Sequence, residues 1–135
     1  MAQPQYPKTI AMAKVQFIQQ LQALGHTVQE LVAANRFFQV INYEIPVGRF
    51  RGQKVRLAFE VQESFPMDAP SGPHFSMQLH ALHPGNDLPH PFGGVHNSPL
   101  GVDWQYWSRP FNEWAGTDKT VKTYLTHIKH LLETA

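Results

Sequence analysis

Hydrophobic residues recur at helical spacing close to the start of the chain, over residues 10–24. Apolar positions three or four residues apart predict an amphipathic helix, and Gly25 directly after them is a typical helix stop signal. Such a helix either covers a sheet or binds a partner protein. The apolar positions are Ile10, Ala13, Val15, Phe17, Ile18, Leu21 and Leu24.

A strand-like pattern replaces the helical one after Gly25. It is clearest over residues 54–61, where every second residue is apolar, as in a strand with one buried face. Those four residues are Val55, Leu57, Phe59 and Val61. β-branched and aromatic residues also mark the stretches 26–32 and 37–45. Residues 74–80 alternate again, with Phe75, Met77 and Leu79 on one side. Four strands in succession predict an antiparallel meander.

The last part of the chain returns to helical spacing, over residues 117–134. Thr117 or Asp118 can cap this helix, and its apolar residues form one stripe. The stripe contains Val121, Tyr124, Leu125, Ile128, Leu131 and Leu132. The chain is therefore expected to be an α+β domain, in which an N-terminal and a C-terminal helix pack on a four-stranded antiparallel sheet. Residues 1–8 are polar with two prolines and are predicted to be a flexible lead-in to a single domain over residues 9–135.

Three segments interrupt the regular patterns. Residues 65–73 hold three prolines and a glycine, a density that predicts a rigid turn without regular structure. Residues 83–103 are rich in Pro, Gly, His and Asn and predict a long loop that is functional or disordered. The stretch 96–114 carries three tryptophans that we interpret as core and loop anchors. They are Trp104, Trp107 and Trp114.

Composition narrows the function classes. The 135 residues have a formal net charge of +1, no basic run and no acidic tail, which argues against a nucleic-acid partner. No apolar stretch approaches the roughly 18–20 residues of a membrane span, and the first residues lack the apolar core of a signal peptide. We therefore expect a cytoplasmic protein. The chain has no cysteine, which excludes disulfides, thiolate metal sites and cysteine nucleophiles.

The order of the elements resembles the ubiquitin-conjugating enzyme fold. The sequence FPMDAPSGPHF at 65–75 is similar to that family's Tyr-Pro-x-x-Pro-Pro segment. His96-Asn97 resembles its His-Pro-Asn motif without the proline, and Trp114 with the helix after it resembles its Trp and following helix. Ser108 stands near the place of the family's catalytic cysteine, eleven residues after Asn97 and six before Trp114. The divergent motifs resemble the bacterial branches of the family.

This resemblance implies a bacterial enzyme that accepts the C-terminus of a ubiquitin-like protein from an ATP-dependent activating enzyme and passes it to a target protein. With serine in place of cysteine, the cargo is expected as an oxyester on Ser108. The resemblance implies that Asn97 donates to the oxyanion. Arg109 can support that charge or orient an Asp carboxylate, and Asp103 can act as a proton acceptor or as an orienting group. The chain itself needs no cofactor, and its N-terminal helix is the expected surface for the activating enzyme.

A serine hydroxyl needs a base within hydrogen-bond reach, and the sequence offers several histidines for this role. They are His96 and, from the adjoining strand and loop, His74, His80, His83 and His90.

Other interpretations stay open. Ser108 can be an ordinary turn residue before Arg-Pro. The chain can be a non-catalytic variant that only binds a ubiquitin-like protein, or a thioester enzyme whose cysteine has been replaced by serine. His80-x-x-His83 has a spacing compatible with zinc, although prolines separate the neighbouring histidines. A Ser-His-Asp hydrolase lacks its Gly-x-Ser-x-Gly elbow here, and the isolated Gly93-Gly94 pair does not make a phosphate loop.

Overall fold

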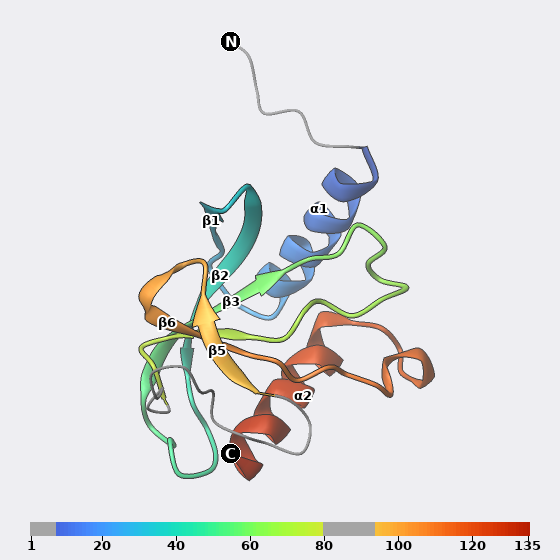
Figure 1. The fold of residues 1–135 in the computed structure, drawn as a ribbon. Helices are drawn as coiled ribbons and strands as arrows, with labels where there is room; N and C mark the ends of the chain where they lie inside the picture. The colour runs from blue at the N-terminus through green and yellow to red at the C-terminus, as the bar shows by residue number, and fades with distance from the viewer. Residues whose placement is uncertain (1–7, 80–93) are drawn as a thin grey trace.

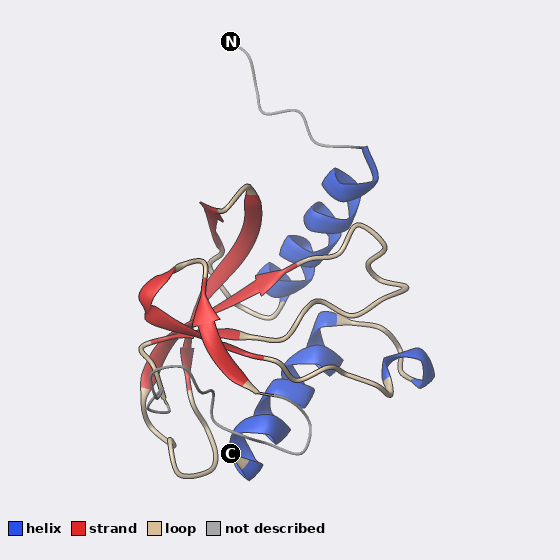
Figure 2. Cartoon of the chain, viewed as in Figure 1, coloured by secondary structure: helices blue, strands red, loops and turns tan. Residues whose placement is uncertain are grey.

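The computed structural model describes residues 8–79 and 94–135. Over these residues the chain forms one antiparallel sheet of six strands with two α-helices and a short 3-10 helix. Both α-helices lie on the same side of the sheet (Figures 1 and 2). The helices are α1 (Lys8–Ala23), α2 (Val121–Thr134) and the 3-10 turn η1 (Trp114–Gly116); the strands are β1 (Gln29–Ala33), β2 (Arg36–Glu44), β3 (Lys54–Glu60), β4 (His74–Ser76), β5 (Val95–Ser98) and β6 (Gly101–Trp107).

The prediction of an α+β domain with an antiparallel sheet is confirmed, but the predicted number of four strands is wrong. The spatial order is β1-β2-β3-β4-β6-β5. The first four strands form the expected meander, and the chain then makes the edge strand β5 before it returns as β6 between β4 and β5. Strand β5 and the first residues of β6 lie in a region rich in Pro, Gly, His and Asn that we predicted to be a loop over 83–103. A short turn at Pro99 and Leu100 joins them, and the dense aromatic residues of β6 were the missed signal.

One face of the sheet packs against both helices and forms the main core. Every second residue of β3 is buried in this core, as predicted. These residues are Val55, Leu57 and Phe59, and the partly buried Val61 packs beside them. The helices contribute their apolar stripes: Ala13, Phe17 and Leu21 from α1, and Val121, Tyr124, Ile128, Leu131 and Leu132 from α2. All three tryptophans are buried. The periodicities of α2 and β3 therefore predicted the buried faces correctly, whereas Val15 and Leu24 of the predicted N-terminal stripe are exposed.

The opposite face carries a smaller apolar cluster. Phe38 and Val40 of β2, Ala58 of β3 and Trp104 of β6 are buried there. Strand alternation places these residues on the side away from the helices. The same alternation puts polar side chains of β2 and β3 on this face, where Arg36 and Glu60 form an ion pair with a contact of 2.7 Å. This polar and aromatic face, rather than the main core, carries the residues of interest below.

Several predicted boundaries need correction. The strand predicted over 74–80 ends at Ser76, and Met77 is exposed, while His80 lies outside the described residues. The first strand begins at Gln29 rather than residue 26. Helix α2 begins at Val121 because its cap is Thr120, whose hydroxyl accepts from the Thr123 amide.

Neither of the predicted caps, Thr117 and Asp118, sits at the start of α2. The Asp118 carboxylate instead accepts hydrogen bonds from the hydroxyls of Thr120 and Thr123. The predicted lead-in lies outside the described residues except for Lys8, where α1 begins. No helix in the described part of the chain has the length and apolar character to span a membrane.

The Pro-rich turn is held by the C-terminal part of the chain. The buried hydroxyl of Tyr124, on α2, donates to the carbonyl of Ser71. The indole Nε1 of Trp114 donates to the carbonyl of Pro66 at 2.9 Å. Proline cannot donate a backbone hydrogen bond, so this turn has few amide groups with which to hold itself in place. The two side-chain donors therefore position it against the core.

We predict that Tyr124→Phe lowers the free energy of unfolding by about 1–3 kcal/mol, because the Ser71 carbonyl loses its donor while the ring packing is kept. Urea titration measures this change. Tyr43→Phe is the matched control, since the half-buried Tyr43 hydroxyl has no hydrogen-bond partner among the described residues; its effect should stay within about 0.5 kcal/mol. Equal effects of the two variants would contradict the clamping role of Tyr124.

Candidate functional site

Ser108 follows directly on β6 and lines a surface groove of roughly 320 Å³, which we call the Ser108 groove. Its backbone amide donates to the Gly94 carbonyl at 3.0 Å, which continues the pairing of β5 with β6 by one step. The side chain is half-buried, and its hydroxyl has no hydrogen-bond partner among the described residues. The groove is lined by Ala69, Pro70, Ser71, Gly72, Tyr106, Ser108, Pro110 and Phe111.

The two walls of the groove come from segments that touch at Gly72. One wall is the Pro-rich turn and the other is the chain from Tyr106 to Phe111. A Cβ on Gly72 would lie only 2.1 Å from the carbonyl oxygen of Trp107 and 3.1 Å from the amide nitrogen of Arg109. Only glycine allows the two backbones to approach this closely. The groove therefore has a closed floor where the turn meets the segment that carries Ser108.

Strand register fixes which side chains share the face of Ser108. Tyr106 pairs with His74 on β4 and with His96 on β5, so the three side chains form a row across the sheet. The Tyr106 ring lies 4.6 Å from the His74 ring and 6.1 Å from the His96 ring, measured between centroids. Ser108 is two residues beyond Tyr106 and follows the same face. His96 is therefore a diagonal neighbour of Ser108, a relation in which Cα atoms are about 7–8 Å apart.

Asn97 and Asp103 do not lie beside Ser108. Asn97 pairs with Gln105, three positions from Ser108, which corresponds to about 10 Å along a strand. It also belongs to the opposite face, because side chains alternate. Asp103 is five positions away, about 17 Å along a strand, and its carboxylate accepts from the Ser76 hydroxyl at 3.1 Å. The two residues predicted as oxyanion donor and proton acceptor are thus separated from the groove.

Arg109 is buried and binds backbone atoms. Its Nη1 donates to the carbonyl of Gly94 at 2.9 Å and to the carbonyl of Ser108 at 3.2 Å. The guanidinium carbon lies 5.6 Å from the centroid of the Trp107 ring, and burial lowers the pKa of this arginine from its usual value. Arg109 therefore ties the end of β6 to the start of β5 and holds Ser108 in position.

His74 is the most strongly perturbed histidine of the described part of the chain. Its ring is buried, with Nδ1 2.8 Å from the Ser98 hydroxyl, and its Nε2 has no hydrogen-bond partner there. Burial, followed by the charge of Arg36, lowers the pKa of His74 to about 4. A neutral imidazole is therefore kept in the row beside Tyr106.

The other candidate bases and the candidate zinc ligands are His80, His83 and His90, which lie outside the described residues. Over residues 8–79 and 94–135, no three His, Asp or Glu side chains are grouped so that they could hold a metal ion.

His127 is a residue near the groove that sequence reasoning did not associate with it. Its ring stacks on Phe111 with 4.2 Å between centroids, and its Nε2 lies 3.4 Å from the Arg109 carbonyl. Burial is the main cause that lowers the pKa of His127. The residue sits on α2, eighteen positions beyond Arg109, so only the packing of α2 against the segment after β6 brings it here.

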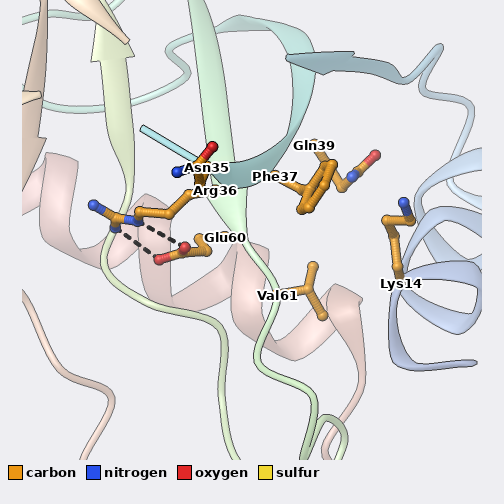
Figure 3. Close-up of a pocket in the computed structure, with 7 residues that line it drawn as sticks. All are labelled: Lys14, Asn35, Arg36, Phe37, Gln39, Glu60 and Val61. Carbon is orange, nitrogen blue, oxygen red and sulfur yellow. Dashed lines mark hydrogen bonds and ion pairs between the residues drawn. The ribbon is translucent and has the colours of Figure 1, made fainter. Parts of the chain in front are cut away.

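A second pocket, of roughly 190 Å³, lies between α1, the start of β2 and the end of β3 (Figure 3). Glu30 accepts from both Lys14 and Gln39, each at 2.8 Å. On the other side of the pocket, the guanidinium of Arg36 donates to the carboxylate of Glu60. Carboxylates thus neutralise both cations that line this pocket. None of the residues predicted to act in catalysis lies in it.

Comparison with families of known proteins gives one match. Residues 14–135 match the family model described as Prokaryotic E2 family E. No curated protein matches the chain significantly.

We predict that Gly72→Ala destabilises the protein by about 1–3 kcal/mol, because the added methyl group must push apart the turn and the Trp107 carbonyl. Gly116→Ala is the matched control, since a Cβ at Gly116 meets nothing within 4 Å; we expect a change within about 0.5 kcal/mol. Urea unfolding of both variants provides the measurement. A neutral Gly72→Ala variant would contradict the close contact of the two backbones.

The low pKa of His74 predicts a loss of stability in mild acid. The unfolded chain binds a proton near pH 6.5 and the folded chain only near pH 4, so this contribution is fully present above about pH 6.5 and decreases as the pH falls toward 4. The full difference corresponds to about 3 kcal/mol. His74→Gln should flatten the free energy of unfolding between pH 6.5 and 4, whereas Asn42→Ala, which changes an exposed side chain that does not titrate, should keep the wild-type slope. Parallel curves for all three proteins would refute this assignment.

Proposed function

The chain belongs to prokaryotic E2 family E, and from this membership we propose that it carries a ubiquitin-like protein as an ester on Ser108. Family membership supports a role in ubiquitin-like conjugation. The observation that carries the finer proposal is that Ser108 lines a groove between two walls held together by the main core. An extended peptide tail can lie in such a groove and bring a carbonyl group to the hydroxyl.

The proposed step is an acyl transfer. The Ser108 Oγ attacks the carbonyl carbon of the activated C-terminus, a C–O bond forms, and the bond from this carbon to the sulfur of an activating enzyme's thioester breaks. The serine proton passes to a base and then to the thiolate that leaves. An alkyl ester is a less reactive acyl group than a thioester, so loading is downhill, while discharge onto a target needs stronger catalysis than in a cysteine enzyme.

His96 is the proposed base because it is the diagonal neighbour of Ser108 on the same face. Arg109 is a positioning residue, since its guanidinium holds the Gly94 and Ser108 carbonyls. Asn97 and Asp103 are not included in the proposed site, because register separates both from Ser108. The proposed partners are an ATP-dependent activating enzyme, which meets α1, a ubiquitin-like protein and its target protein.

The test is to mix the protein with its activating enzyme, its ubiquitin-like protein and ATP, and to follow the adduct by mass spectrometry. We expect an adduct that resists thiol reducing agents and is cleaved by mild base. Ser108→Ala should abolish it, and Ser108→Cys should convert it into an adduct that thiols cleave.

Ser71→Ala is the matched control for this test, because Ser71 lines the same groove; the adduct should persist in this variant. Absence of any adduct in the wild-type protein, or an adduct unaffected by Ser108→Ala, would overturn the proposal.

A second candidate function is a binding module that holds the ubiquitin-like protein without a covalent step. It is favoured by the observation that no histidine or carboxylate of the described residues hydrogen-bonds the Ser108 hydroxyl. If the protein is a binding module, we expect saturable binding of the ubiquitin-like protein in the absence of ATP. Ser108→Ala should leave this binding unchanged, and no adduct should form. Calorimetric titration with both forms of the protein separates the two candidates.

A further inference from the structure

We propose that Tyr106 is a catalytic residue that donates a hydrogen bond to the acyl oxygen while Ser108 reacts. The proposal rests on the proposed function of Ser108 and deepens it. The site otherwise has no donor for the oxyanion among the residues expected to supply one. Asn97, the residue expected in that role, pairs with Gln105 and lies on the other face of the sheet.

The position of Tyr106 fits this role. Tyr106 and Ser108 line the same groove and follow the same face of β6, two residues apart. A phenol reaches several ångströms above the sheet, whereas the serine hydroxyl stays close to it. A carbonyl group held between the two side chains can therefore offer its carbon to Ser108 and its oxygen to Tyr106.

The ring of Tyr106 is held by its neighbours before any substrate binds. It lies between His74 on β4 and His96 on β5, at centroid distances of 4.6 Å and 6.1 Å. Pairing of β6 on both of its edges fixes the backbone beneath it. Its hydroxyl has no hydrogen-bond partner among the described residues. A donor that is already oriented and unpartnered needs no reorganisation when negative charge develops on the substrate, which is what makes an oxyanion donor effective.

In this step Tyr106 only donates a hydrogen bond and does not transfer a proton. As the Ser108 Oγ adds to the carbonyl carbon, the pair of electrons of the C=O bond moves to oxygen, and the Tyr106 hydroxyl donates a hydrogen bond to that oxygen. Tyr106 keeps its proton. When the tetrahedral intermediate collapses, the C=O bond re-forms and the leaving group departs, while the serine proton passes through the base to that group.

The experiment uses p-nitrophenyl acetate as a small activated ester and the full chain as the enzyme. Acetylation of Ser108 is followed over time by peptide mapping, and released p-nitrophenol is followed by absorbance. We expect Tyr106→Phe to slow acetylation of Ser108 by about 10²-fold, the loss typical of one oxyanion donor. The melting temperature should stay close to that of the wild type, because the ring remains in place.

Two controls separate the possible outcomes. Tyr43→Phe removes a hydroxyl far from the groove in sequence and face and should leave the rate unchanged. If the wild-type protein is acetylated at Ser108 and Tyr106→Phe is equally fast, the role of Tyr106 is overturned while the proposed function of Ser108 stands. If Ser108 is acetylated no faster than a serine in an unfolded peptide, and no adduct forms with the ubiquitin-like protein, both proposals are overturned together.

Discussion

The hydrogen bond from the Tyr124 hydroxyl to the Ser71 carbonyl is the contact on which the Ser108 groove depends. It joins α2 to a turn that is rich in proline and has few amide donors of its own. Trp114 reinforces the contact by donating to the Pro66 carbonyl. With the turn held in this way, Gly72 can meet the backbone at Trp107, and a groove forms between the turn and the end of β6. The packing of Tyr124 and Trp114 in the main core thus sets the position of one wall of the Ser108 groove.

The chemistry of the site is decided on the face of the sheet away from the helices. There the row of His74, Tyr106 and His96 crosses three strands, and Ser108 follows at the end of the central one. Arg109 is buried at this end of the strand, and its guanidinium donates hydrogen bonds to the carbonyls of Gly94 and Ser108. Its guanidinium therefore secures the backbone, and Tyr106, which lines the groove, is the side chain that we propose as the hydrogen-bond donor there.

Membership of prokaryotic E2 family E and the absence of cysteine set the chemical question for this chain. A conjugating enzyme needs a carrier for an acyl group, and a hydroxyl is a weaker nucleophile than a thiolate at neutral pH. A serine carrier consequently depends more on its base and on the donor for the oxyanion. The two side chains that register brings near Ser108 are a histidine and a tyrosine, which suit those two tasks.

The sequence by itself determined the elements whose signals are local. The apolar stripe of α2 and the alternation in β3 predicted their buried faces, and that of α1 did so in part, because the periods of 3.6 and 2 residues are properties of neighbouring positions. The motifs around 65–75 and His96-Asn97, taken in order, were enough to indicate a bacterial branch of the conjugating-enzyme family.

Tertiary structure decided how the site is assembled. Strand β5 carries a weak local signal and is stabilised by pairing with β6, which itself pairs with β4, and only the folded chain provides these partners. Pairing of His96 with Tyr106, rather than one residue further, puts His96 on the face of Ser108 and Asn97 on the other. A shift of one residue in a strand reverses every side chain. For this reason the spacing of eleven residues between Asn97 and Ser108 along the chain does not tell which side chains lie beside Ser108 in the fold.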